Sequence, residues 1–203
     1  FSPKNPNQPT RHQAVIEPSH RYYEQPPARA GRSMHRLANE VSRQVDEARQ
    51  TAAKFPHASR KEEIVFTRNT TEAINLVANA LDWKPGDVVL LTDKEHNSNL
   101  IPWQMLARRF GVSLKFIPSN PDNTFNLSAY QQALQGGVRL VAMGCTSNLD
   151  GVSIPAEEVV RLAHKHGAQV LLDAAQTAPH QRIDVRRLDA DWVAFSGHKM
   201  LAP

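Results

Sequence analysis

The chain has 203 residues, of which 40% are hydrophobic and 22% are charged, enough apolar material for one globular domain with an appendage. Its 24 lysines and arginines are scattered among 20 acids, a pattern that argues against a nucleic-acid partner and leaves an anionic small ligand open. A single cysteine, Cys145, excludes an internal disulfide, and no apolar run approaches the roughly 18 residues that a membrane span needs. We therefore expect a cytoplasmic protein that binds neither nucleic acid nor membrane.

The beginning of the sequence has no initiator methionine and no hydrophobic signal core, so we expect the numbering to start inside a longer chain. Residues 1–33 are rich in Pro, Asn and Gln and predict an N-terminal arm with a short helical piece around residues 14–23. Residues 34–55 place an apolar side chain at every third or fourth position, which predicts a long amphipathic helix. We assign residues 34–203 to one ligand-binding domain.

From residue 63 onward, strand-like apolar runs alternate with amphipathic segments. The expected strands are 63–67, 87–92, 113–118, 139–144, 169–173 and 192–196, and the expected helices are 70–81, 99–110, 128–135 and 156–166. This alternation predicts an α/β fold, a mostly parallel sheet with helices on both faces. In such a sheet, ligands bind outside the carboxyl ends of the strands.

Local signals mark several of these boundaries. Ser128 and Gln131 resemble a capping box, and Pro155 stands where a helix is expected to begin. Gly111 and Gly167 follow the ends of two expected helices.

Polar residues follow several of the expected strands. Thr70 and Thr71 open a helix and offer a phosphate cradle of hydroxyls and backbone N–H groups, although ordinary helix capping by threonine explains them equally simply. His96 follows the second strand, where a lone loop histidine is most often a surface residue. Asn148 follows the fourth strand and either bonds a ligand or caps its own turn.

Two further strand ends carry a sharper signal. Asp173 ends a buried apolar strand, with Gln176 three residues later, and a buried carboxylate needs a cationic partner or a helix to cap. Ser196, His198 and Lys199 follow the next strand. A lysine near a carboxylate and a phosphate cradle is the arrangement that pyridoxal 5′-phosphate requires, because the lysine forms a Schiff base and the acid keeps the ring nitrogen protonated.

The sequence also resembles a known family, the class V aminotransferases among the fold-type I pyridoxal phosphate enzymes, and within it the cysteine desulfurase and selenocysteine lyase branch. The matching stretches are RSMHRLA (32–38), FTRNTTEAINLVA (66–78), EHNSNLIPWQ (95–104), TSNLDG (146–151), LLDAAQTAPHQRIDV (171–185) and DADWVAFSGHKMLAP (189–203). They occur in family order and cover most of the chain from residue 32 onward.

The resemblance implies a role for each candidate residue. Lys199 is expected to be the Schiff-base lysine and the base that moves the substrate Cα proton. Asp173 is expected to pair with the ring nitrogen, Gln176 to bond the phenolic oxygen, and His96 to stack on the ring and assist as an acid–base partner. The phosphate is expected to contact Thr70, Thr71, Ser196 and His198, and Asn148 to line the substrate side.

Some positions depart from the family pattern. Asn69, Ala174 and Ala202 stand where glycine is common, and Cys145 stands where histidine is usual, which places a cysteine near the site but not at the family's sulfur-accepting position. The resemblance also implies that family members run longer than this chain. We expect the small C-terminal domain, the loop with the nucleophilic cysteine and the arginine that binds the substrate carboxylate to lie beyond residue 203.

The resemblance predicts a homodimeric enzyme that converts L-cysteine or L-selenocysteine to L-alanine and delivers the sulfur or selenium, with a sulfur-acceptor protein as a further partner. Other class V chemistries stay open: a transaminase, a C–S lyase, an epimerase or a kynureninase-like hydrolase, since the residues that choose the reaction lie elsewhere. A third reading is a truncated, non-catalytic fragment that acts by binding a partner.

Overall fold

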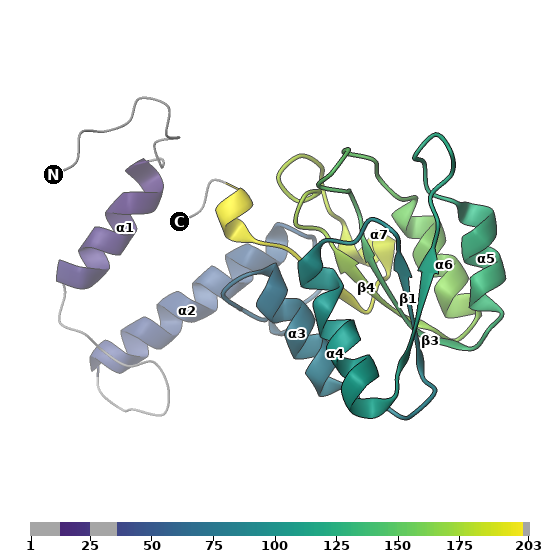
Figure 1. Ribbon diagram of the computed structural model, residues 1–203. Helices are drawn as coiled ribbons and strands as arrows, with labels where there is room; N and C mark the ends of the chain where they lie inside the picture. The colour runs from purple at the N-terminus through teal and green to yellow at the C-terminus, as the bar shows by residue number, and fades with distance from the viewer. Residues whose placement is uncertain (1–12, 25–35, 201–203) are drawn as a thin grey trace, which may run out of the picture.

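The computed structural model describes residues 13–24 and 36–200 (Figure 1). The helices are α1 (Gln13–Glu24), α2 (Arg36–Lys54), α3 (Thr70–Ala80), α4 (Ile101–Phe110), α5 (Leu127–Leu134), α6 (Ala156–Lys165) and α7 (Val185–Leu188). The strands are β1 (Val88–Thr92), β2 (Ser113–Ile117), β3 (Val138–Gly144), β4 (Gln169–Asp173) and β5 (Trp192–Ala194). Short 3-10 helices are η1 (Lys61–Glu63), η2 (Asn97–Asn99) and η3 (Gly197–Lys199). Within these residues, no helix is both long and apolar enough to cross a membrane.

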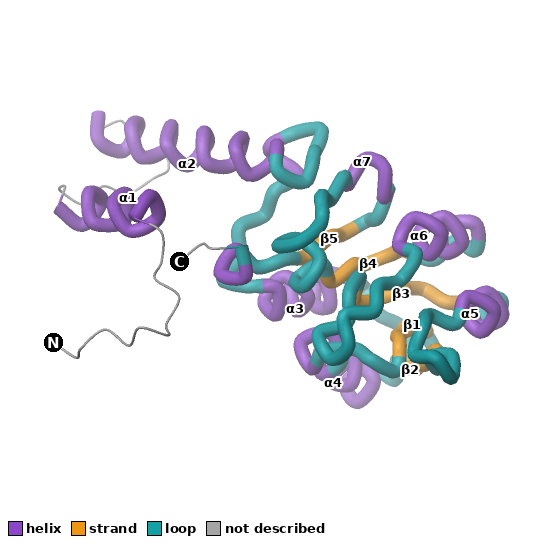
Figure 2. Tube along the Cα trace, turned by 90° about the horizontal axis from the view of Figure 1, so that it is seen from above, coloured by secondary structure: helices purple, strands orange, loops and turns teal. Residues whose placement is uncertain are grey.

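The five strands form one parallel sheet in the order β2-β1-β3-β4-β5. Figure 2 shows α3 and α4 on one side of the sheet and α5 and α6 on the other. Alternate side chains of a strand serve the two sides: Val89 and Leu91 pack in the core with α3 and α4, whereas Val88 and Leu90 pack with α5 and α6. The predicted α/β fold with a parallel sheet covered on both faces is therefore confirmed.

The strand expected at residues 63–67 is wrong. A strand exists only with a hydrogen-bonded neighbour, and none of the described strands pairs with this segment. Val65 and Phe66 are 65% and 55% exposed, as expected for a strand-like sequence without a partner. The segment is held instead by α2, because Arg49 hydrogen-bonds the carbonyl of Ile64 and lies 5.1 Å from the centre of the Phe66 ring.

Helix boundaries follow local capping, with one correction. The capping box expected at Ser128 is wrong, because α5 begins one residue earlier and Asn126 accepts the backbone N–H of Ala129 instead. Gly111 ends α4 in the left-handed conformation, with φ of 71°, as predicted. The helix α7 was not predicted, because its four residues are too few to show a helical period.

The long helix predicted for residues 34–55 begins at Arg36 among the described residues, while Met34 and His35 lie outside them. Figures 1 and 2 show α2 projecting from the body of the sheet and α1 lying beyond its far part. At the other end of α2, Phe55 contacts Phe195 with ring centres 5.7 Å apart. The helix is thereby anchored beside the segment that follows β5.

The connections create a crevice between β1 and β3. The chain leaves β1 into α4 on one face of the sheet, and it leaves β3 into α6 on the opposite face. Since these two strands are neighbours, the connections that leave their carboxyl ends diverge to opposite faces of the sheet. This topological switch point is where ligands bind in open α/β sheets.

Candidate active site

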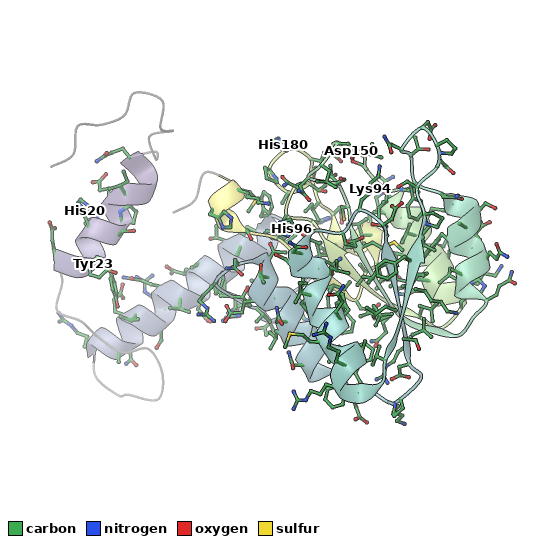
Figure 3. The ribbon with its side chains drawn as sticks, viewed as in Figure 1. His20, Tyr23, Lys94, His96, Asp150 and His180 are labelled. Carbon is green, nitrogen blue, oxygen red and sulfur yellow. The ribbon has the colours of Figure 1, made fainter. Side chains whose placement is uncertain are left out.

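A cavity of about 260 Å³ lies at the carboxyl ends of the strands. This volume lies close to the lower end of the range of small-molecule pockets, about 300–1,000 Å³. All nine residues singled out from the sequence line it: Thr70, Thr71, His96, Asn148, Asp173, Gln176, Ser196, His198 and Lys199. Figure 3 shows His96 and Lys94 at this edge of the sheet. The structure therefore gathers residues from five separate strand ends and loops around one hollow.

One end of the cavity is built from hydroxyl groups at the start of α3. Ser196 Oγ accepts the backbone N–H of Thr70 at 2.8 Å and lies 2.6 Å from Thr70 Oγ1, so the segment after β5 is tied to the helix N-terminus. Asn69, not a threonine, caps the helix by accepting the N–H of Glu72 at 2.9 Å. The simple capping explanation for Thr70 and Thr71 is therefore wrong, and their hydroxyls surround the positive end of α3, as a phosphate site requires.

His96 is oriented by its neighbour Ser98. The backbone N–H of Ser98 donates to His96 Nδ1 at 3.1 Å, so Nδ1 is an acceptor and the neutral ring carries its proton on Nε2. Ser98 Oγ lies 3.0 Å from the same nitrogen and 2.7 Å from Thr71 Oγ1. The imidazole is thus connected through Ser98 to the hydroxyl cluster at the start of α3.

Asp173 is a buried acid, only 8% exposed, at the floor of the cavity. Oδ1 accepts the N–H of Ala175 at 2.9 Å. Burial raises the pKa of Asp173 above its ordinary value, while that hydrogen bond and the nearby Lys199 and His96 act to lower it. A cationic ligand group at this carboxylate would offset its desolvation, and a protonated pyridine nitrogen fits that description.

Lys199 reaches the cavity from the strand next to Asp173. Ala194 of β5 is the register partner of Asp173, and η3, which contains Lys199, begins three residues after it. The backbone N–H of Lys199 donates to the carbonyl of Ser196 at 3.2 Å. The spacing between Asp173 and Lys199 in the sequence therefore corresponds to neighbouring strands, as expected.

Asn148 belongs to the turn after β3, and other side chains stabilise that turn. Ser147 Oγ accepts the N–H of Leu149 at 3.1 Å, and Asp150 Oδ1 accepts the N–H of Val152 at 3.1 Å. The turn therefore does not depend on Asn148 as a cap, and Asn148 lines the cavity.

Cys145 lies near the cavity without lining it. The residue is 6% exposed and borders a separate hollow beside α6 and α7. Burial raises the pKa of its thiol to about 12, with Asp173 and Glu95 adding to the effect. The thiol is thus protonated at neutral pH and is a poor nucleophile.

Glu95 is a site residue that the sequence interpretation missed. It lines the cavity, and burial raises the pKa of its carboxyl group to about 7 although hydrogen bonds from Thr92, Asn99 and Gly144 oppose the shift. Its position three residues after the end of β1 is a weak signal in the sequence, because Glu95 does not itself end a buried strand as Asp173 does.

Lys94 was also missed, and it joins three loops at the rim of the cavity. Nζ lies 2.6 Å from Asp150 Oδ2 and 2.8 Å from the carbonyl of Asn123. Figure 3 shows Lys94 beside Asp150 at the edge of the sheet. The ion pair links the turn after β1 with the turn after β3.

Comparison with known proteins places these features in a family. The family profile described as Aminotransferase class-V matches residues 8–203. A probable cysteine desulfurase of Synechocystis sp. is 44% identical over 195 residues, which are 94% of this chain and 46% of the relative. A cysteine desulfurase of Escherichia coli (strain K12 / DH10B) is 40% identical over 194 residues, which are 93% of this chain and 47% of the relative.

Solved structures give the same result. The apo cysteine desulfurase of Thermococcus onnurineus NA1 superposes with a TM-score of 0.85 at 39% identity, over 93% of this chain and 48% of that one. The cystine C-S lyase C-DES, solved in complex with cysteine persulfide, gives a TM-score of 0.80 at 29% identity, over 95% of this chain and 51% of that one. A C-DES mutant with glycine covalently linked to the PLP cofactor also matches, with a TM-score of 0.80 at 28% identity, over 93% of this chain and 49% of that one.

The chain spans about half the length of the curated relatives it matches. The matched half contains the parallel sheet and every site residue described above. Because the family profile matches nearly the whole sequence, residues 8–203, the chain belongs to the class-V aminotransferase family.

Proposed function

We propose that this chain forms the cofactor-binding part of a pyridoxal-phosphate-dependent cysteine desulfurase, which removes sulfur from L-cysteine and leaves L-alanine. The observation that carries the proposal is the convergence of Lys199, Asp173 and the Thr70–Ser196 hydroxyl cluster on one cavity. The relatives that are named cysteine desulfurases support the choice of reaction.

Each residue then has a defined task. Lys199 would hold the cofactor aldehyde and move the proton at the substrate Cα atom, and Asp173 would keep the ring nitrogen protonated. Thr70, Thr71, Ser196 and His198 would hold the phosphate. When bound, pyridoxal phosphate supplies a ring that accepts the electrons released at Cα.

The remaining site residues would bind the ring itself and the substrate. Gln176 would bond the phenolic oxygen, Asn148 would line the substrate side, and His96 would lie against the ring as an acid–base partner. The proton on Nε2 of His96, set by the bond from Ser98 to Nδ1, suits a donor at that nitrogen.

The proposal extends to properties of the whole enzyme. We assign residues 34–203 to the cofactor-binding domain and residues 1–33 to an N-terminal arm. The family resemblance supports a cytoplasmic homodimer, a sulfur-acceptor protein as partner, and L-selenocysteine as a second substrate. Cys145, the single cysteine of the 203 residues, has a buried thiol with a raised pKa, which supports an acceptor cysteine outside this sequence.

Product analysis tests the reaction. The purified full-length protein, loaded with pyridoxal phosphate and given L-cysteine with a thiol reductant, is expected to form L-alanine and sulfide in equal amounts. Formation of pyruvate with ammonia would indicate a C–S lyase instead, and formation of D-cysteine would indicate an epimerase. A keto acid together with the aminated cofactor would indicate a transaminase. Any of these three products in place of alanine would overturn the desulfurase assignment.

A further inference from the structure

The carboxylate of Glu95 bridges the two strands that form the topological switch point. Oε1 accepts the hydroxyl of Thr92 at 2.6 Å and its backbone N–H at 3.3 Å, at the end of β1. Oε2 accepts the side-chain amide of Asn99 at 2.7 Å and the backbone N–H of Gly144, at the end of β3, at 3.0 Å. One side chain thus joins β1, β3 and η2.

The hydrogen bond to Asn99 also holds η2 in place. Asn99 is fully buried, and its Oδ1 accepts the indole N–H of Trp103 at 3.1 Å, so its side chain is held from both sides. Its backbone N–H donates to the carbonyl of His96 at 2.7 Å. The turn that carries His96 and Ser98 therefore rests on Glu95 at one end and on α4 at the other.

Every partner of Glu95 is a hydrogen-bond donor. An ionised carboxylate accepts from all four, whereas an amide of the same shape would turn an NH₂ group toward one pair of donors. The residue is also costly as a plain structural element, since burial works against its ionised form. The four donors around Glu95 stabilise the ionised carboxylate against that cost.

We propose that Glu95 is a positioning residue for the reaction. Its carboxylate holds η2 in place, so that His96 Nδ1 accepts the hydrogen bond from the backbone N–H of Ser98 and the ring proton stays on Nε2. The inference rests on the proposed function for its catalytic meaning, because His96 is the group that would meet the cofactor ring. Glu95 acts through His96 and Ser98, and it also steadies the Ser98–Thr71 contact at the phosphate end.

The test is the variant Glu95→Gln, with Glu158→Gln as the matched control, because Glu158 is a surface acid on α6 that pairs with Arg161. In the cofactor-free full-length protein, ¹⁵N NMR of the His96 ring at a pH where it is neutral reports which nitrogen carries the proton. The unaltered protein and the control are expected to show the Nε2–H form, and Glu95→Gln a mixture of both forms. The dissociation constant for pyridoxal phosphate should rise about tenfold in Glu95→Gln.

A folded Glu95→Gln protein with unchanged His96 ring signals would overturn the proposal, and so would a lower melting temperature without any change in those signals. If Glu95→Gln does not fold, the variant Thr92→Val provides the test, since it removes the shortest of the four hydrogen bonds to Glu95. Shifted His96 ring signals in Thr92→Val would support the proposal, and unchanged signals would overturn it. Failure of the unaltered protein to bind pyridoxal phosphate would count against the proposed function alone, because the ring signals are measured without cofactor.

Discussion

Replacing Lys199 with alanine is expected to lower alanine formation from L-cysteine about a thousandfold or more. The variant loses the covalent anchor for the cofactor and also the base at the substrate Cα atom, and a positioned base alone contributes roughly 10² to 10⁴ in rate. The measurement is the rate of alanine release by the full-length protein under saturating cofactor.

The control for this experiment is Lys165→Ala, which removes an exposed lysine at the end of α6. Its rate should match that of the unaltered protein. A Lys199→Ala protein that keeps a tenth or more of the activity would show that another group performs the proton transfer, and the assignment of Lys199 would fail.

Replacing Asp173 with asparagine is expected to lower the same rate by about a hundredfold to a thousandfold. Asparagine keeps the shape and the acceptor for the N–H of Ala175, but it removes the charge that would hold a proton on the ring nitrogen. Breaking a buried charge pair by neutralising one partner costs several kcal/mol, roughly 3–5, which corresponds to at least this loss in rate.

The cofactor-free protein should respond to Asp173→Asn in the opposite direction. Because burial raises the folded-state pKa of Asp173 above that of the unfolded chain, the ionised carboxylate disfavours folding at neutral pH. The variant is therefore expected to have a melting temperature at least as high as that of the unaltered protein. The control Asp82→Asn, at an exposed position, should change neither the melting temperature nor the rate of alanine formation. A lower melting temperature together with full activity would show that Asp173 is a structural acid.

The sequence predicted the sheet well where strands are buried on both faces. The runs at 139–144 and 169–173 agree with β3 and β4 to within one residue, because a continuous apolar run has few other ways to be buried. Residues 63–67 have the same composition, yet strand formation there depends on a pairing neighbour that the described residues do not supply. Local sequence cannot report the presence of a distant partner.

The candidate site could be predicted because its residues sit where strands end. Asp173 and Lys199 were placed correctly at adjacent strand ends, and the rule that parallel strands share one binding edge brought them together. Glu95 was missed because its role depends on the hydrogen bond that it accepts from the backbone N–H of Gly144, a group on another strand. Cys145 was expected near the site, but the direction of its side chain depends on packing against α6 and α7, which the sequence does not show.

The most direct test of the central claim is borohydride reduction of the full-length protein after incubation with pyridoxal phosphate, followed by intact mass and peptide mapping. We expect one pyridoxyl group per chain, located on Lys199, and none on the Lys199→Ala variant. A protein without the adduct, or with the adduct on another lysine, would contradict the assignment of this cavity as a pyridoxal phosphate site.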